Sequence, residues 1–347
     1  MPRLRRVDCS APGIKRKRHG RGFAYYDASG ERITDPELVL RVKALGIPPA
    51  WKDVWICPDA NGHLQAVGTD AAGRKQYIYH VVWRQRQDQA KFDHMMDFAE
   101  MLPTMRAVTL DHLQLEGQPR EKTLGLAVRL LDRGFFRIGS EGYAEENQSY
   151  GLATIQKKHV TISDNKVTFD YRSKGGQRRI WSTVDPIMLE VIGSLKRRRS
   201  GGPDLLVYKN GRLWHDIRSS DINEYVREIS GGDFTAKDFR TWGATVLAAV
   251  GLAASGNAAG SRTARKRAIA RSVKEVAHYL GNTPAVCRAS YIDPRVFDRY
   301  LSGLTISLDS IGEGIESGDP ATQGPIEEAV VDLIEDRRRS PALEKIA

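Results

Sequence analysis

The sequence predicts an α+β fold, in which a small N-terminal antiparallel β-sheet domain precedes a larger, mainly α-helical domain that contains a three-stranded β-meander. Three observations support this. Apolar and polar residues alternate in much of the stretch from 25 to 79, whereas apolar residues three or four apart dominate from about residue 85. A second alternating stretch at 158–183 interrupts the helical region. With 347 residues, the chain is long enough for two separate cores.

The N-terminal sheet is predicted from strands that are separated by turn residues. Residues 54–57 form one strand, and the turn that follows contains Asn61-Gly62. Further strands are expected at 63–69 and 74–80, joined by a turn that ends at Gly73. Asn-Gly and Gly-rich turns between alternating strands are typical of hairpins. We therefore predict a β-rich domain over residues 23–88.

The second domain is expected to span residues 89–308. One helix face is formed by Phe92, Met95, Met96, Ala99 and Leu102, and Pro103 should end that helix. Helices are expected at 104–116 and 121–133, the second of them capped by Gly134. The meander should consist of strands at 159–163, 166–173 and 177–183, and from Pro186 to about Leu301 the chain should be mostly helical.

Charge is distributed unevenly. Residues 1–22 hold eight Lys/Arg and one acidic residue, which predicts a basic N-terminal arm. Residues 309–347 hold ten acidic and four basic residues and are expected to form an acidic C-terminal tail. Residues 1–308 carry 49 Lys/Arg against 33 Asp/Glu, a net charge of +16. Net charge alone fits a solvated basic surface as well as a polyanionic partner, but the basic runs at 15–18, 196–199 and 262–271 favour nucleic acid.

Several other classes of protein lack support. The longest apolar stretch, residues 246–254, is far shorter than the roughly 20 residues of a membrane span. The N-terminus has no signal-peptide pattern, and three widely spaced cysteines indicate neither a disulfide framework nor a zinc site, so a reducing cytoplasm is expected. The chain has no Gly-Lys-Ser/Thr phosphate loop, no Gly-x-Ser-x-Gly motif and no His–carboxylate cluster. We therefore expect no membrane, no nucleotide, no metal and no other cofactor.

One constellation suits phosphodiester chemistry without a metal. Such cleavage requires a nucleophile, cations that neutralise the transition state, and an acid for the leaving oxygen. Arginine matches phosphate geometry and stays charged, and lysine can serve as an acid. Taken singly, each candidate has an ordinary structural role, such as a surface ion pair, a solubilising turn residue or a helix cap. Together they form a set: Arg137, Lys174, Arg240, Asn282 and Tyr291.

These residues lie in long segments that closely resemble the small poxvirus-like type IB DNA topoisomerases, including their bacterial relatives. The resemblance runs from about Pro48 to Tyr300. It is carried by PPAWKDVWICPDANGHLQAVGTDAAGRKQYIYH at 48–80, FFRIGSEGYAEENQSYGLATI at 135–155, YRSKGGQ at 171–177, KDFRTWGAT at 237–245 and LGNTPAVCRASYIDP at 280–294.

The resemblance implies a role for each residue of the set. Tyr291 matches the nucleophile that joins the 3′ phosphate, and Arg137 and Arg240 match the arginines on the non-bridging oxygens. Lys174 matches the general acid toward the 5′ oxygen, with Arg137 assisting. Asn282 stands where many relatives carry histidine. Because Asn donates hydrogen bonds but does not titrate, electrostatic stabilisation is expected there and proton transfer is in doubt.

Further residues are expected to contact double-stranded DNA. The resemblance implies major-groove contacts for Gln76, Tyr77 and Tyr79, next to Arg74 and Lys75. Since alternate strand residues face opposite sides, Tyr77 and Tyr79 should share a face that Gln76 does not. The helix with a basic run should contact phosphates and brake rotation through Arg262, Arg265, Lys266, Arg267 and Arg271.

The resemblance also implies a C-shaped clamp around the duplex and an enzyme that relaxes supercoils without ATP. Nick, rotation and resealing would proceed through a phosphotyrosyl intermediate, and a nucleoid-associated monomer is the expected state. Two rivals remain. A tyrosine recombinase shares the chemistry, although recombinases usually carry His-x-x-Arg where this chain has Lys237-x-x-Arg240. A non-catalytic duplex-DNA-binding protein would explain the charge but not all five filled positions.

Overall fold

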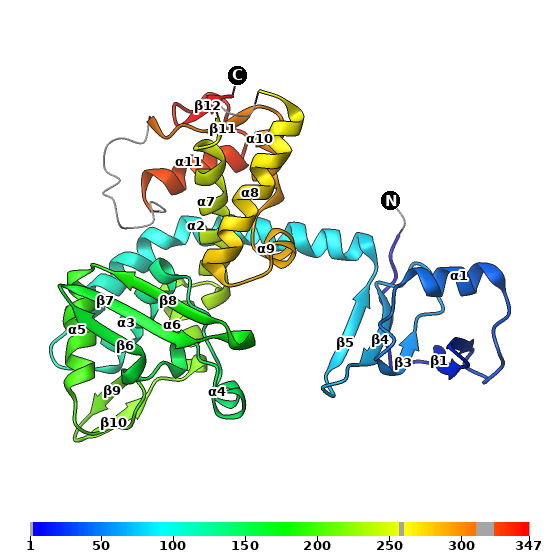
Figure 1. Ribbon diagram of the computed structural model, residues 1–347, viewed down its shortest axis with the longest axis horizontal. Helices are drawn as coiled ribbons and strands as arrows, with labels where there is room; N and C mark the ends of the chain where they lie inside the picture. Colours follow the sequence, from blue (N-terminus) through cyan, green and yellow to red (C-terminus); the bar gives the residue numbers. More distant parts are fainter. Residues whose placement is uncertain (1–2, 257–259, 310–322, 347) are drawn as a thin grey trace. The chain divides into compact units, whose positions relative to one another are not determined.

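The computed structural model describes residues 3–256, 260–309 and 323–346. The chain forms two compact units, Met1–Asp93 and His94–Ala347. No helix within those described ranges combines the length and the apolar character that a membrane crossing requires. The mixed α+β class expected from the sequence is confirmed, because an antiparallel sheet in the first unit is followed by helices and a second antiparallel sheet (Figure 1).

The first unit is a five-stranded antiparallel sheet in the order β2-β1-β3-β4-β5, with one covering helix. Its core contains Ile14, Tyr25, Val42, Val54, Ile56 and Ala66, so helix α1 packs on the sheet through Val42. The strands predicted at 54–57, 63–69 and 74–80 are present as β3, β4 and β5. The elements of this unit are β1 (Ile14–His19), β2 (Gly22–Tyr26), α1 (Pro36–Ala44), β3 (Lys52–Ile56), β4 (Leu64–Thr69) and β5 (Lys75–Tyr79).

The expected basic arm over residues 1–22 is not observed from residue 14 onward, where strand β1 pairs with both β2 and β3. Ile14 is buried in the core, which fixes the strand. The guanidinium of Arg16 donates to the carbonyls of Ile47, Pro48 and Trp51 at 3.1, 3.0 and 2.8 Å. The prediction of a basic arm rested on net charge alone, and the alternation that turns Ile14 and Arg16 toward the protein was overlooked.

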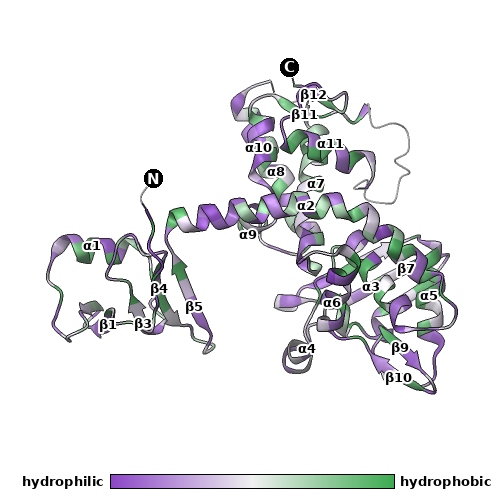
Figure 2. Cartoon of the chain, turned by 180° about the vertical axis from the view of Figure 1, so that it is seen from behind, coloured by the Kyte–Doolittle hydropathy of each residue, from purple (hydrophilic) through white to green (hydrophobic). Residues whose placement is uncertain are grey.

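Helix α2 (Val81–Leu113) continues through Pro103, so the prediction that the helix ends there is wrong. Phe98, Leu102 and Met105 are completely or almost completely buried on either side of the proline. Proline removes one backbone hydrogen bond from a helix, and burial of these apolar side chains along one face compensates for it. Along α2, hydrophilic and apolar bands alternate, as Figure 2 shows.

The three-stranded meander is present with the expected turns, as β6 (Val160–Ser163), β7 (Lys166–Arg172) and β8 (Arg178–Thr183). Asp164 and Asn165 both adopt positive φ in the first turn. Around the meander lie α3 (Arg120–Gly134), α4 (Glu141–Asn147), α5 (Pro186–Arg197) and the 3-10 turns η1 (Leu152–Thr154), η2 (Lys157–His159) and η3 (Lys174–Gly176). An unpredicted hairpin follows, formed by β9 (Val207–Asn210) and β10 (Leu213–Asp216).

Among the remaining helices, α7 (Ala236–Ala253) has most of its residues buried. Helix α7 has Ala236, Ala244, Val246, Ala248, Ala249 and Leu252 among its buried residues and packs against α3, α8 and α11. These elements are α6 (Ser219–Ser230), α7 (Ala236–Ala253), α8 (Arg262–Leu280), α9 (Pro284–Ser290), α10 (Pro294–Leu301), β11 (Leu304–Ile306), α11 (Pro325–Ile334) and β12 (Leu343–Lys345).

Part of the expected acidic tail belongs to this core. Ile326, Val330 and Leu333 of α11 are buried, and β12 pairs with β11. Residues 310–322 of that tail lie outside the described residues. The prediction of an acidic tail rested on the composition of the segment and overlooked its apolar residues, which lie three or four positions apart as on one face of a helix.

Candidate active site

Arg240 reaches its position from the first turns of α7. The helix starts at Thr235, whose hydroxyl and backbone N–H both donate to the Asp238 carboxylate at 2.9 and 2.8 Å. This reciprocal cap fixes the direction of the first turn. Arg240 is only 3% exposed. Its guanidinium donates to the carbonyl of Phe135 and, at 3.0 Å, to the carbonyl of Leu280.

The C-terminal end of α8 gathers three arginines. Gly281 ends the helix with φ +62°, a conformation that favours glycine. The last carbonyls of a helix have no intrahelical partner and carry partial negative charge. Here three consecutive ones accept from arginines of three different elements. Tyr279 O accepts from Arg179 of β8 (3.1 Å), Leu280 O from Arg240 of α7 (3.0 Å), and Gly281 O from Arg137 after α3 (2.7 Å).

The C-terminal end of α3 faces the same arginines. Gly134 O accepts from Arg179 at 2.6 Å, and Phe135 O accepts from Arg240. The expected glycine cap is corrected, because the left-handed residue is Phe135 with φ 52°. Gly134 is needed for space instead, since a Cβ there would lie 2.3 Å from the Phe136 ring. The two helix ends thus share Arg179 and Arg240.

The arginine cluster has no acidic counter-charge. Within the described residues, Arg137, Arg179 and Arg240 donate to carbonyls and to Asn282, and none pairs with a carboxylate. Burial and the neighbouring Arg137 charge lower the pKa of Arg240 to about 10, with Tyr291 acting in the opposite direction. Burial likewise lowers the pKa of Arg179. Arginine side chains are cations in proteins, so the cluster is suited to an anion.

Tyr291 lies at the end of α9, beside Arg240. The Cζ atom of Arg240 is 5.3 Å from the centroid of the tyrosine ring. The Thr245 hydroxyl of α7 accepts from the Asp293 N–H at 3.1 Å, and its single proton is shared between Thr241 O at 3.0 Å and Tyr291 O at 3.3 Å. One helix therefore carries the arginine and also anchors the tyrosine backbone. Burial raises the pKa of the nearby Cys287 thiol to about 11, so it stays protonated and unreactive at neutral pH.

Asn282 follows the glycine that ends α8. Its Oδ1 accepts from Arg137, whereas its Nδ2 is buried without a partner among the described residues. A buried donor without an acceptor costs about 1–3 kcal/mol. An incoming phosphate oxygen is the kind of acceptor that would satisfy this N–H.

Lys174 occupies the exposed turn between β7 and β8. Gly175 and Gly176 adopt positive φ in this turn, at 78° and 75°. Within the described part of the chain, Lys174 has no hydrogen-bond or ion-pair partner. The structure therefore brings together Arg137, Arg240, Asn282 and Tyr291, and it places Lys174 on the hairpin whose second strand contributes Arg179.

Arg179 was missed by the sequence analysis. It sits in an alternating strand beside Arg178, and nothing in the pattern distinguishes the two side chains. Only the fold does so. Arg178 is exposed and pairs with Asp170 at 2.5 and 2.8 Å, whereas Arg179 reaches the two helix ends.

In the first unit, the candidate DNA-contact residues are divided by strand alternation as expected. Tyr77 and Tyr79 are exposed on one face of β5, with stacked rings 6.1 Å apart. Gln76 lies on the other face and donates to Asp70 at 2.9 Å. Arg74 also donates to Asp70 at 3.0 Å, and its backbone N–H is the main cause that lowers the pKa of Asp70 to about 2. Lys75 is exposed on the same face as the tyrosines.

On α8, Arg262, Lys266, Arg267 and Arg271 are exposed, whereas Arg265 is partly buried and donates to Leu301 O at 3.2 Å. Arg265 thus faces the protein. Lys274 and His278 were not among the predicted DNA-contact residues. They are exposed and continue the helix face that carries Arg267 and Arg271, with Lys274 three positions after Arg271 and His278 four positions after Lys274. These residues form a basic stripe, namely Arg267, Arg271, Lys274 and His278, that leads to the arginine cluster.

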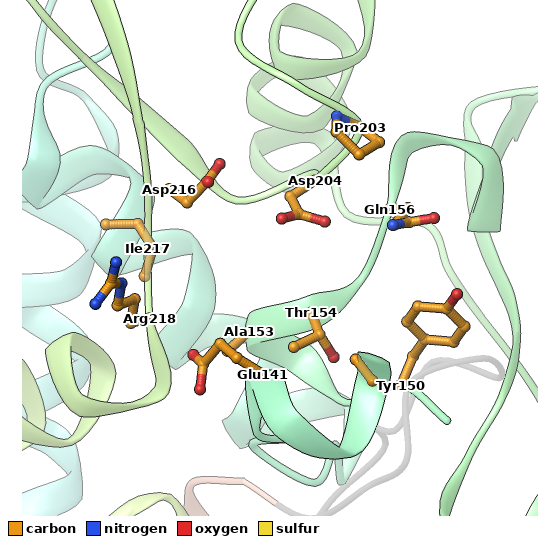
Figure 3. Close-up of a pocket in the computed structure, with 11 residues that line it drawn as sticks. Glu141, Tyr150, Ala153, Thr154, Gln156, Pro203, Asp204, Asp216, Ile217 and Arg218 are labelled. Atoms are coloured by element: carbon orange, nitrogen blue, oxygen red, sulfur yellow. The ribbon is translucent and has the colours of Figure 1, made fainter. Parts of the chain in front are cut away.

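A separate pocket of about 630 Å³ has the opposite character (Figure 3). Glu141, Asp204 and Asp216 line it, together with one cation, Arg218. Burial, together with the charge of Asp216, raises the pKa of Asp204. Three carboxylates against one cation make this lining less favourable for phosphate than the arginine cluster.

Comparisons with known proteins agree with both units. Residues 80–303 match the family described as eukaryotic DNA topoisomerase I, catalytic core, and residues 22–70 match bacterial DNA topoisomerase IB, N-terminal domain. The DNA topoisomerase 1B of Acanthamoeba polyphaga mimivirus is 31% identical over 296 residues, which are 83% of this chain and 87% of the viral protein. The DNA topoisomerase 1 of Rabbit fibroma virus is 22% identical over 81% and 90% of the two chains, and that of vaccinia virus (strain Copenhagen), DNA topoisomerase 1B, is 23% identical over 69% and 73%.

The fold and these matches define an isomerase that changes the topology of DNA. The chain belongs to the type IB DNA topoisomerase family, and DNA is its substrate.

Proposed function

We propose that this topoisomerase relaxes supercoiled duplex DNA by cutting one strand with Tyr291 and resealing it, without ATP or metal. The observation that carries the proposal is the cluster of arginines, none of which pairs with a carboxylate among the described residues, with Arg240 Cζ 5.3 Å from the Tyr291 ring. A cluster of buried and partly buried cations of this kind favours an anion such as a phosphate diester, and the adjacent phenol supplies a nucleophile.

The proposed step exchanges one ester for another. Tyr291 Oη bonds to phosphorus and gives up its proton to solvent, and the bond from phosphorus to the 5′ oxygen breaks. Lys174 protonates that oxygen, which leaves as a free hydroxyl, while the 3′ phosphate remains on the tyrosine. Because the energy of the ester is kept, the 5′ hydroxyl reseals the strand by the reverse step.

The other residues stabilise the transition state. Arg137 and Arg240 contact the non-bridging oxygens, and the free N–H of Asn282 Nδ2 donates to one of them. Asn282 carries no titratable proton, so its contribution is electrostatic. Gln76, Tyr77 and Tyr79 contact the major groove of the duplex, and Arg74, Lys75 and the exposed cations of α8 bind its phosphates.

A C-shaped clamp of the two units around DNA, braking of rotation by α8, a monomeric state and a cytoplasmic, nucleoid-associated location stay predictions. While the 5′ end is free, torsion turns the duplex, and supercoils of either sign are relaxed.

The test is relaxation of negatively supercoiled plasmid in EDTA without ATP. Wild type should relax the plasmid, and Tyr291→Phe should bind it and leave it supercoiled. Tyr279→Phe is the matched control, because Tyr279 is an exposed tyrosine on α8 and should keep full activity. Denaturation during the reaction should trap protein on 3′ ends. Relaxation by Tyr291→Phe at the wild-type rate would refute the nucleophile.

A further inference from the structure

We infer that Arg179 is a positioning residue of the cleavage reaction, which holds the turn carrying Lys174 against the C-terminal end of α8. The inference rests on the proposed function, because it gives Arg179 a task only where Lys174 acts as the acid.

The hairpin is tied to the arginine cluster through Arg179. Arg179 pairs with Tyr171 across β7 and β8, five positions after Lys174. Its Nη1 donates to Tyr279 O at 3.1 Å and its Nη2 to Gly134 O at 2.6 Å. The first acceptor lies one residue before the carbonyl that Arg240 uses in α8, and the second lies one residue before the carbonyl that Arg240 uses after α3. A single side chain therefore sets the hairpin against both helix ends.

The surroundings of Gly281 confirm that the hairpin reaches the site. A Cβ added at Gly281 would lie 3.5 Å from Arg137 Nη1, 3.7 Å from Gln177 Oε1 and 4.0 Å from Arg179 Nη1. Gln177 immediately follows the turn Lys174–Gly176. The end of the hairpin is thus within van der Waals distance of the residue before Asn282.

The chemistry of Arg179 argues against a purely stabilising role. It is mostly buried, it has no carboxylate partner among the described residues, and its Nε is buried without any acceptor. Burying a cation in this way costs free energy. A guanidinium is nevertheless suited to this position, because its planar fork holds two carbonyls at a fixed distance, which a lysine cannot do.

Loss of Arg179 should release the hairpin and leave the rest of the site in place. Arg240 and Arg137 keep their own carbonyls, and Thr245 still anchors the Tyr291 backbone. The defect should therefore affect proton delivery to the 5′ oxygen more than charge stabilisation at phosphorus.

Two substrates separate these effects. A cleavage site is first mapped on duplex DNA with wild type and denaturant, and two duplexes are then made with either oxygen or sulfur as the 5′ bridging atom at that phosphate. In both, a phosphorus–oxygen bond forms to Tyr291 and the bond to the 5′ atom breaks. The 5′ oxygen leaves as an alcohol and needs a proton from an acid. The 5′ sulfur leaves as a thiolate without that proton, because the pKa of a thiol is only about 8.5.

Single-turnover cleavage by Arg179→Ala should be slowed about 100-fold on the oxygen substrate and less than about threefold on the sulfur substrate. Lys174→Ala should show the same selectivity, and Lys174→Ala/Arg179→Ala should be no slower than Lys174→Ala alone. Arg178→Ala is the matched control, since it removes an exposed arginine of the same strand that pairs with Asp170, and it should slow neither substrate. Arg179→Lys retains the positive charge but should still show most of the slowing seen with Arg179→Ala. If urea unfolding shows that Arg179→Ala is not folded, Arg179→Lys takes its place in the test.

Equal slowing on both substrates, additive defects in the double variant, or no slowing at all would overturn the role of Arg179, provided that Lys174→Ala shows the oxygen-selective defect. If Lys174→Ala itself slows both substrates equally, the assignment of the acid in the proposed function fails first, and the inference fails with it.

Discussion

Two arginines of the second unit, the buried Arg240 and the partly buried Arg106, have opposite kinds of partners. Arg106 of α2 donates to both oxygens of Asp132 at 2.9 Å and to both oxygens of Glu327. Within the part of the chain that the structure describes, Arg240 donates to the carbonyls of Phe135 and Leu280 and to no carboxylate. Burial by itself would lower both pKa values, but the bonds to Glu327 and Asp132 raise the pKa of Arg106, whereas that of Arg240 falls to about 10.

The difference indicates which arginine is structural. Arg106 joins α2, α3 and α11, and Glu327 also accepts from Trp242 Nε1 at 2.8 Å, two residues after Arg240. This charge is balanced within the protein and has nothing left to bind. Among the described residues no carboxylate balances the charge of Arg240, which leaves that charge available for the proposed phosphate.

The largest effect should come from Arg240→Ala. We expect single-turnover cleavage to slow by about 10²–10³-fold, the usual loss for one transition-state donor. The unfolding free energy should fall by at most about 1–2 kcal/mol, because two carbonyls lose a donor while an unbalanced buried charge is removed. Cleavage assays and urea titrations measure the two quantities. A large loss of stability with normal cleavage would reverse the comparison.

Glu327→Ala should do the reverse. Removing this carboxylate leaves Arg106 with Asp132 alone and the indole N–H of Trp242 without an acceptor, so the unfolding free energy should fall by about 2–3 kcal/mol. Cleavage per folded molecule should stay within about threefold of wild type. Glu328→Ala, on the exposed side of the same helix, is the control that should leave stability unchanged.

The smallest expected effect is on pH dependence. A cation whose pKa is lowered to about 10 loses its charge earlier as pH rises, so half of the Arg240 side chains are neutral near pH 10. Between pH 8 and 10, Tyr291→Phe should therefore lose about twofold more affinity for a short duplex than Tyr291→Phe/Arg240→Ala does. Fluorescence anisotropy checks this. Identical pH profiles would mean that Arg240 keeps its charge throughout.

Much of the fold was predictable, because turn chemistry is local. The Asp164-Asn165 turn and the Lys174–Gly176 turn placed the meander strands within a residue or two. The β9–β10 hairpin was missed, although Asn210-Gly211 is a strong hairpin signal. Pro103 and the basic segment at 14–19 were misjudged for another reason, since apolar packing and backbone carbonyls overrode a local preference in both.

The site was less accessible to sequence reasoning. Resemblance supplied Arg137, Arg240, Asn282 and Tyr291, and the structure brings these four together. The main-chain carbonyls of residues 280 and 281 hold Arg240 and Arg137, and that of residue 279 holds Arg179; no side-chain pattern reveals these acceptors. For the same reason Arg179 could not be separated from Arg178 before the fold was known.

The bond between Glu327 and Trp242 joins residues 85 positions apart in the chain. While the polypeptide is still being synthesised, α7 emerges long before α11 does. During that interval the indole N–H lacks its Glu327 acceptor, and Arg106 has only one of its two carboxylates. The helix that carries Arg240 therefore completes its packing only after α11 has been synthesised.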